Sequence, residues 1–113
     1  MERKFFVLSL KHLYPWKYGE RLCLWGYKRT NDDEERCFGG YNGDPSTSEL
    51  YSIDEFVARY NENNFFNIPR TPQKINPVEL KKMKRKYDAV FIDKEDVEKY
   101  YKSCGIEKEA DNA

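Results

Sequence analysis

The sequence predicts a small α+β domain in which an antiparallel sheet packs with three helices. Short runs of strand-forming residues, separated by proline and glycine, occupy the first third of the chain. Later segments carry helix caps followed by apolar residues at helical spacing. With 113 residues, 39% of them apolar and 35% charged, the chain suits one domain with a modest core. We expect this domain to span residues 1–105 and to be followed by a flexible polar tail, 106–113.

Three segments near the N-terminus are expected to form a meander. Phe5–Leu10 is rich in strand-forming residues, and its length suits a central strand covered on both faces. The loop Lys11–Glu20 contains proline and glycine, which interrupt strands. Arg21–Arg29 alternates like a second strand, and Arg36–Tyr41 is expected to be the third. A charged turn, 31–35, would join the second strand to the third.

Two capping motifs predict where the first two helices start. Ser52 and Glu55 have the S-x-x-E spacing of a capping box. Asn76 and Pro77 are a suitable cap and first helical residue. Between these helices we expect Phe65–Pro69 to be an edge strand or a loop, because proline removes a ladder hydrogen bond. The apolar stripes expected to face the core are Ile53, Phe56, Val57 and Tyr60 in the first helix, and Val78, Leu80, Met83 and Tyr87 in the second.

A short strand and a third helix are expected near the C-terminus. Ala89–Ile92 is apolar and completes the sheet as a short late strand. Asp93 is suited to cap the following helix, and Gly105 to end it. The expected buried stripe of this helix is Val97, Tyr100, Tyr101 and Cys104.

Cysteine usage and hydropathy bear on the compartment. The three cysteines are widely spaced without a C-x-x-C pair, which favours a reducing cytosol over a disulfide framework or a zinc site. We expect Cys23 and Cys104 to be small core residues. No apolar run approaches the roughly 18 residues that span a bilayer, and no signal peptide is recognisable. The sequence therefore predicts a cytoplasmic protein with no membrane partner, metal or cofactor.

Charge is segregated along the chain although its net value is zero. Residues 1–30, 31–63, 64–87 and 88–113 carry net charges of +5, −7, +6 and −4. This alternation argues against a protein that wraps nucleic acid with a uniformly basic surface. It is compatible with blocks that neutralise each other in the fold, with a local anion site, or with two oppositely charged faces.

Catalytic motifs are absent from the sequence. A Ser-His-Asp or Cys-His arrangement would have to use His12, the only histidine. There is no H-E-x-x-H, Walker A or EF-hand pattern. We therefore expect the protein not to be an enzyme.

A binding face is predicted in the opening hairpin, where several side chains are least explained by folding. Aromatic residues often carry most of the affinity of protein interfaces. Strand alternation places Trp25 and Tyr27 on one face, so we expect both to be buried or both exposed. Alanine at Tyr14 or Trp16 is expected to weaken binding without lowering the melting temperature. The candidate residues are Lys11, His12, Tyr14, Trp16, Trp25 and Tyr27.

A nucleotide pocket is an alternative interpretation of the same region. The segment Gly39-Gly40-Tyr41-Asn42-Gly43 can let backbone N–H groups approach a phosphate, although the glycines also simply allow a sharp turn. Basic side chains would bind phosphates and aromatic rings would stack on a base. Such a pocket, shared between protomers of a homo-oligomer, would be lined by Lys11, His12, Trp25, Tyr27, Arg36 and Tyr41.

The second predicted helix carries a basic patch, Lys81, Lys82, Lys84 and Arg85. A helix with one apolar stripe and many lysines is commonly just solvated on its other faces. The alternative is that the patch binds a nucleic-acid backbone or an acidic protein surface.

Three segments carry a resemblance: Val7-Leu8-Ser9-Leu10-Lys11-His12, Leu24-Trp25-Gly26-Tyr27 and Phe38-Gly39-Gly40-Tyr41. Together they resemble a group of small uncharacterised proteins encoded by phages and prophage-like elements. The pattern of that group runs VLSLKHT, a short loop, ITFWGPDNxGY and an AGKY-like segment before a helix. This chain departs from it at Leu13, where the group has threonine, and in the turn Lys28–Glu35. The resemblance covers the first third of the chain and implies a mobile-element origin, but no particular activity.

These observations favour a non-enzymatic phage or mobile-element protein that inhibits a bacterial defence system by binding a protein component in the host cytoplasm. Defence inhibition is expected by analogy with other small phage proteins that lack catalytic motifs. One alternative is a sponge that sequesters a nucleotide immune signal. Another is a single-stranded nucleic-acid-binding or regulatory domain that uses the rings and the basic helix.

Overall fold

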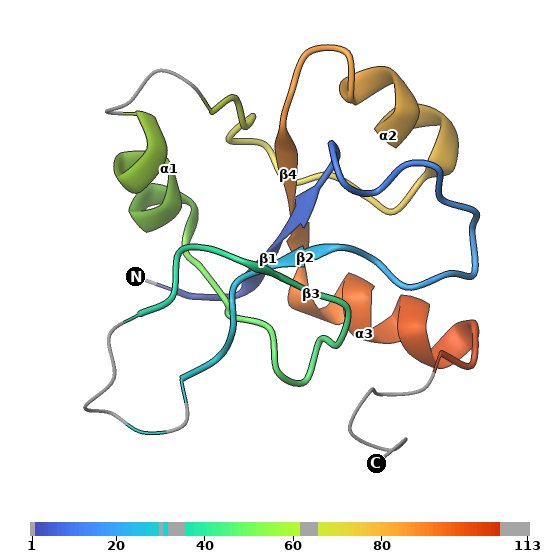
Figure 1. The fold of residues 1–113 in the computed structure, drawn as a ribbon, viewed down its shortest axis with the longest axis horizontal. Coiled ribbons are helices and arrows are strands. Elements are labelled where there is room, and N and C mark those ends of the chain that lie inside the picture. Colours follow the sequence, from blue (N-terminus) through green and yellow to red (C-terminus); the bar gives the residue numbers. More distant parts are fainter. Residues whose placement is uncertain (1, 30, 32–35, 62–65, 107–113) are drawn as a thin grey trace.

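A computed structural model describes residues 2–29, 31, 36–61 and 66–106. It confirms an α+β fold with a four-stranded antiparallel sheet and three helices (Figure 1). The predicted turn residues 32–35 and Phe65 lie outside the described residues, as do residues 107–113 of the predicted tail. Ile106, the first residue of that tail, packs against the core. The elements are β1 (Phe5–Ser9), β2 (Leu24–Trp25), β3 (Tyr41–Asn42), α1 (Ile53–Asn61), α2 (Pro77–Met83), β4 (Ala89–Asp93) and α3 (Lys94–Ser103).

The sheet has the strand order β3-β2-β1-β4, so the first three strands form the expected meander and β4 pairs with β1. Five residue pairs join β1 to β4, from Phe5 opposite Asp93 to Ser9 opposite Ala89. Every residue of β1 is buried. The prediction of a central strand covered on both faces is therefore confirmed.

The strand β2 is shorter than the predicted Arg21–Arg29, and β3 shares only Tyr41 with the predicted third strand, Arg36–Tyr41. Gly26 has a φ of +77° and its N–H donates to the carbonyl of Gly40, so the extended conformation of the second strand ends at Trp25. Before β3, the indole N–H of Trp25 donates to Phe38 O at 2.8 Å and the hydroxyl of Tyr51 donates to Cys37 O. Side chains thus take carbonyls that a longer strand would have used in its ladder.

Helices cover both faces of the sheet and divide the core into two clusters (Figure 1). On one face, Phe56 and Val57 of α1 pack with Trp25. On the other, Leu80 of α2 and Val97 of α3 pack against β1, β2 and β4. Because both faces are sealed in this way, the open sheet surface is confined to its edges.

The predicted caps are confirmed. Ser52 N–H donates to Glu55 Oε2 at 2.7 Å, and Glu55 N–H donates to Ser52 Oγ at 3.2 Å, completing the capping box. Asn76 accepts from two N–H groups in the first turn of α2, and Asp93 accepts from Glu95 N–H. Two apolar positions of the second predicted helix differ from the prediction. Val78 is 63% exposed instead of facing the core, and Tyr87, although packed against the core, lies beyond the end of α2 at Met83.

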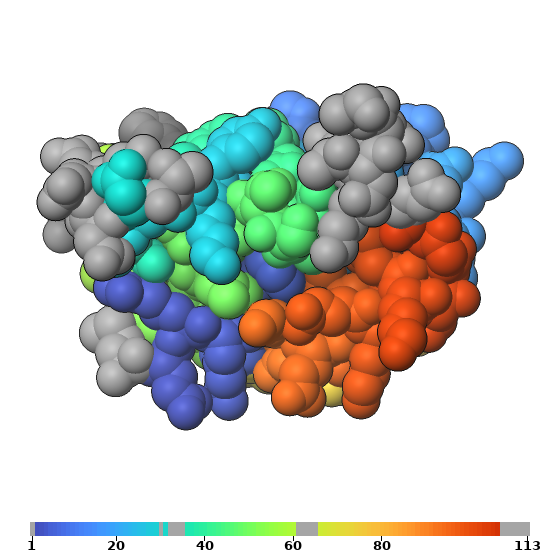
Figure 2. Space-filling model, turned by 90° about the horizontal axis from the view of Figure 1, so that it is seen from below, coloured from blue at the N-terminus to red at the C-terminus, as the bar shows by residue number. Residues whose placement is uncertain are grey.

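Two tyrosines of α3 hold distant loops in place. The hydroxyl of Tyr100 accepts from Gly19 N–H and donates to Glu20 O. The hydroxyl of Tyr101 accepts from Leu22 N–H at 2.9 Å and donates to Gly43 O at 2.6 Å. Figure 2 shows the loop after β3, in green, beside α3, in orange-red. These bonds fix the loops that flank the candidate site.

Candidate functional site

Trp25 and Tyr27, expected to be buried together or exposed together, lie in opposite environments. Trp25 is 9% exposed and Tyr27 is 52% exposed. Strand alternation does not extend across Gly26, because its positive φ turns the chain between the two rings. The prediction of a shared face is wrong, and only Tyr27 is available to a partner.

Trp16 is also a core residue. It is 8% exposed, and its indole N–H donates to Glu20 O at 3.3 Å. This burial overturns the expectation that alanine at Trp16 leaves the melting temperature unchanged. Tyr14 is partly buried, and its shielded hydroxyl has no hydrogen-bond partner among the described residues. Burial raises the pKa of that hydroxyl.

Tyr41 contacts His12 through its ring and Tyr27 through its backbone carbonyl, and we call these three residues the tyrosine face. Tyr41 is 40% exposed, and its ring lies 4.4 Å from that of His12 and 5.0 Å from that of Trp25. The hydroxyl of Tyr27 donates to Tyr41 O at 2.6 Å, and the Tyr27 ring packs over Gly40. These contacts hold both exposed tyrosines in defined positions.

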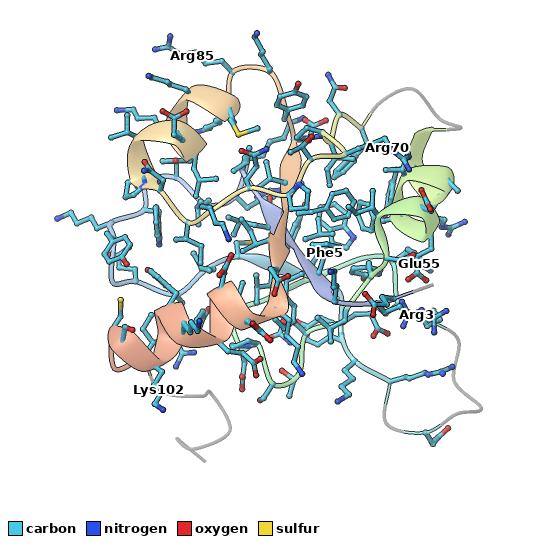
Figure 3. All side chains as sticks on the ribbon, turned by 180° about the vertical axis from the view of Figure 1, so that it is seen from behind. Arg3, Phe5, Glu55, Arg70, Arg85 and Lys102 are labelled. Carbon is cyan, nitrogen blue, oxygen red and sulfur yellow. The ribbon has the colours of Figure 1, made fainter. Side chains whose placement is uncertain are left out.

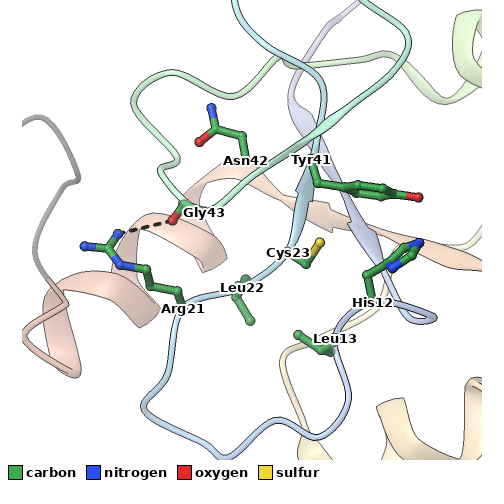
Figure 4. A pocket seen from close by; sticks show the side chains of 8 residues that line it. All are labelled: His12, Leu13, Arg21, Leu22, Cys23, Tyr41, Asn42 and Gly43. Carbon is green, nitrogen blue, oxygen red and sulfur yellow. Dashed lines mark hydrogen bonds between the residues drawn. The ribbon is translucent and has the colours of Figure 1, made fainter.

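A shallow pocket of about 250 Å³ adjoins the tyrosine face (Figure 4). We call it the Cys23 pocket. In Figure 4 the rings of His12 and Tyr41 lie on one side, and the guanidinium of Arg21 points to Gly43 O, at 3.4 Å, on the other. Its lining residues are His12, Leu13, Arg21, Leu22, Cys23, Tyr41, Asn42 and Gly43.

The Cys23 pocket places the only histidine and a cysteine together, as a thiol nucleophile and its base would require. Burial raises the pKa of the Cys23 thiol, the opposite of what an activated cysteine needs. Cys23 and Cys104, both predicted to be small core residues, are half-buried, and Cys104 packs against the core. Among the described residues, no side chain hydrogen-bonds the ring of His12 and so orients it as a base. The pocket therefore lacks the features of a Cys-His catalytic pair.

Lys11 lies next to this region but is engaged in an ion pair. Its Nζ is 2.7 Å from Asp88 Oδ1, and this bond raises the pKa of the lysine. Burial is the largest of the effects that raise the pKa of Tyr41, and the charge of Cys23 raises it further. A hydrogen bond from Ser9 and the charge of Lys11 lower this pKa, but by less. Tyr41 is therefore a neutral phenol at neutral pH.

Arg36, predicted to line a nucleotide pocket, is bound to carboxylates instead. Its guanidinium lies 3.2 Å from Glu49 Oε1 and 3.1 Å from Glu55 Oε1, and it donates to Leu50 O. Only 18% of its side chain is exposed. The charge of Arg36 is thus matched within the fold, and the residue has a structural role beside α1.

A second hollow lies between the loop Lys11–Glu20 and α2. We call it the loop–helix groove. It has a volume of about 450 Å³ and brings Tyr14 and Trp16, from one predicted site, next to Lys81, from the predicted basic patch. Lys84 Nζ lies 4.8 Å from the centre of the Tyr14 ring. The groove is lined by Tyr14, Pro15, Trp16, Lys17, Glu20, Pro77 and Lys81.

The basic patch is exposed throughout, as its lysines and Arg85 all face solvent. Lys84 and Arg85, predicted on the second helix, follow the end of α2 at Met83, and Figure 3 shows Arg85 beyond that end, pointing away from the domain. Lys82 Nζ is 3.8 Å from Glu79 Oε1, within one helix turn. The patch is thus a solvated face, one side of which borders the loop–helix groove.

The structure therefore separates the predicted site residues into groups. His12, Tyr27 and Tyr41 come together, while Trp25 lies behind them in the core and Arg36 lies elsewhere. Asn42 and Gly43 of the pocket belong to the predicted glycine segment. Sequence reasoning did not single out the other lining residues, which are Leu13, Arg21, Leu22 and Cys23 in the pocket and Pro15, Lys17, Glu20 and Pro77 in the groove. Cys23 lies two residues before Trp25 in the predicted second strand, so strand alternation places both on one face. Because Trp25 pairs with Tyr41 in the sheet, this alternation was a usable signal for placing Cys23 near Tyr41.

Comparisons with known proteins add no relative: no family model, curated protein or solved structure matches this chain. Within the described part of the chain, no helix is long and apolar enough to cross a membrane. Across the same residues, no cluster of three or more His, Cys, Asp or Glu side chains is arranged to hold a metal ion.

Proposed function

We propose that this protein is a non-enzymatic binding protein of a phage or another mobile element. It inhibits a bacterial defence system by binding a protein component of that system through the tyrosine face. The phage-like pattern of the N-terminal segments supports the origin, and the exposed rings support the mode of action.

The observation that carries this proposal is the pair of exposed tyrosines held in place by the fold. Tyr27 and Tyr41 are joined by a hydrogen bond of 2.6 Å, and Tyr41 rests against buried Trp25. Rings that are fixed before binding lose little conformational entropy when a partner covers them. Tyrosine is also among the residues that most often dominate the energy of a protein interface.

A nucleotide sponge is the second candidate, because His12, Tyr41 and the backbone near Gly43 border one pocket. The pocket volume of about 250 Å³ is below the roughly 300–1,000 Å³ of typical small-molecule sites. Lys11 and Arg36, expected to bind phosphates, are paired with carboxylates. Protein binding is therefore the better supported function.

The test is a phage-plating assay in bacterial strains that each carry one defence system. We expect the protein to restore plating in a strain whose defence component it binds. Truncating Tyr41 to alanine should weaken that binding by roughly 10- to 100-fold, the effect of losing an interface hot spot. The matched control is Tyr18→Ala, because Tyr18 is 59% exposed but packs against Trp16 and Tyr100, away from the face.

Equal binding by the two alanine variants would contradict the assignment of the face, and plating restored in no strain would argue against defence inhibition. Thermal unfolding in the presence of a panel of cyclic nucleotides distinguishes the nucleotide sponge from a protein-binding inhibitor. A tight nucleotide ligand must raise the melting temperature by mass action, and a sponge requires such a rise.

A further inference from the structure

The loop–helix groove combines apolar walls with a basic border. Its lining includes two prolines, Pro15 and Pro77, the ring of Trp16, and two lysines, Lys17 and Lys81. The groove volume of about 450 Å³ falls within the roughly 300–1,000 Å³ of sites that hold part of a ligand. Its two walls come from segments about sixty residues apart, both anchored to the core.

The exposure of Val78 adds a second apolar feature on α2. This valine follows Pro77 directly and is 63% exposed, although helix α2 buries Leu80. Lone exposed apolar residues are ordinary, and Val78 is not one of the residues that line the groove. The apolar contribution of α2 to the groove is therefore Pro77, the chain neighbour of Val78.

The charge around the groove is predominantly positive. Three lysines, Lys17, Lys81 and Lys84, lie at or beside the groove. The one acidic residue that lines it is Glu20, whose carboxylate accepts from the backbone N–H of Lys17. No described acidic group lies within ion-pair distance of Lys17 or Lys81. An acidic occupant would therefore meet cations whose charges are not already matched.

A nucleic acid fits this groove less well than a polypeptide. Single-stranded nucleic acids bind through ring faces on which their bases stack. Here Trp16 is 8% exposed, and Lys84 lies over the Tyr14 ring. The apolar walls are instead prolines, which suit an aliphatic or aromatic side chain.

From these observations we propose that the loop–helix groove binds an extended acidic peptide segment of a partner protein. One apolar side chain of that segment lies between Pro15 and Pro77, and flanking carboxylates pair with Lys17 and Lys81. The site is separate from the tyrosine face, and it stands or falls independently of the proposed function.

The experiment is a selection of random twelve-residue peptides on the immobilised full chain, followed by fluorescence anisotropy of a labelled enriched peptide. We expect enriched sequences to carry an apolar residue flanked by Asp or Glu. Reversing one groove charge, in Lys81→Glu or Lys17→Glu, should weaken binding roughly fivefold or more, because an attractive pair becomes repulsive. Lys102→Glu is the matched control, since it reverses an exposed lysine in the last turn of another helix and should change affinity less than twofold.

Circular dichroism melting shows whether each variant is folded. Because one variant lies in the loop and the other in the helix, the test can still be decided if one of them destabilises the protein. Enrichment of basic or uncharged peptides would overturn the proposal, as would wild-type affinity in both groove variants. A labelled oligo-dT is measured in parallel. If oligo-dT binds more tightly than the best peptide and Lys81→Glu weakens the binding of oligo-dT, the occupant of the groove is a nucleic acid and not a peptide.

Discussion

The two tryptophans lie in the opposite environment to Tyr27 and Tyr41, the two tyrosines of the tyrosine face. Trp16 and Trp25 are 8% and 9% exposed, and each indole N–H donates to a backbone carbonyl. Tyr27 and Tyr41 are 52% and 40% exposed, and the Tyr27 hydroxyl donates to the backbone carbonyl of Tyr41. A segment rich in aromatic residues is therefore not by itself evidence of a binding face. Neighbouring rings can divide between the core and the surface.

The largest expected effect tests the core half of this comparison. Trp25 contacts the rings of Phe56, Tyr60 and Phe66 as well as Tyr41. We expect Trp25→Ala to lower the free energy of unfolding by about 3–5 kcal/mol, because a large buried side chain leaves a cavity. Urea denaturation measures this change. A loss under about 1 kcal/mol would mean that Trp25 is not part of the core.

The glycine that separates the two environments gives the next effect. Gly26 has a φ of +77°, and a Cβ there would lie 2.2 Å from the Tyr51 hydroxyl. We expect Gly26→Ala to cost about 2–3 kcal/mol through backbone strain and displacement of that hydroxyl. The control is Gly39→Ala, where an added Cβ meets nothing within 4 Å. Equal urea midpoints for the two variants would contradict the role of Gly26.

A smaller, pH-dependent effect tests the carboxylates beside α1. Burial alone would raise the pKa of Glu55, but the Ser52 N–H, Arg3 and Arg36 outweigh it and lower the pKa. Glu55 binds its proton less readily in the folded state, so its contribution to stability is present above its usual value of 4.5 and is lost as pH falls through the lower folded value. We expect the free energy of unfolding to decline below about pH 4.5, and less steeply in Glu55→Gln. The free energy of unfolding is measured by urea titration at each pH. An equally steep decline in the wild type and in Glu55→Gln would contradict this role of Glu55.

Much of the fold could be predicted because its signals are local. The caps at Ser52, Asn76 and Asp93 depend on residues two or three positions away, and all three are observed. The burial of β1 follows from its apolar composition alone. Helix starts and the central strand were therefore accessible from the sequence.

The site was harder to predict because it depends on contacts between distant segments. Arginine is a residue type that often binds anions, and this made Arg36 a candidate. Its ion pairs with Glu49 and Glu55 form only in the folded chain. The groove likewise exists because the loop containing Trp16 packs beside α2, far along the chain. The ends of β2 and β3 depend on side chains that bind backbone carbonyls, which periodicity does not reveal.

The central claim is that the partner covers the tyrosine face. An NMR titration of the isotope-labelled full chain with the defence component identified by plating tests it most directly. We predict that the largest amide changes fall at His12, Tyr27 and residues 40–43. Largest changes at the exposed positions Ala58 and Arg59 of α1, with none at Tyr41, would contradict the account.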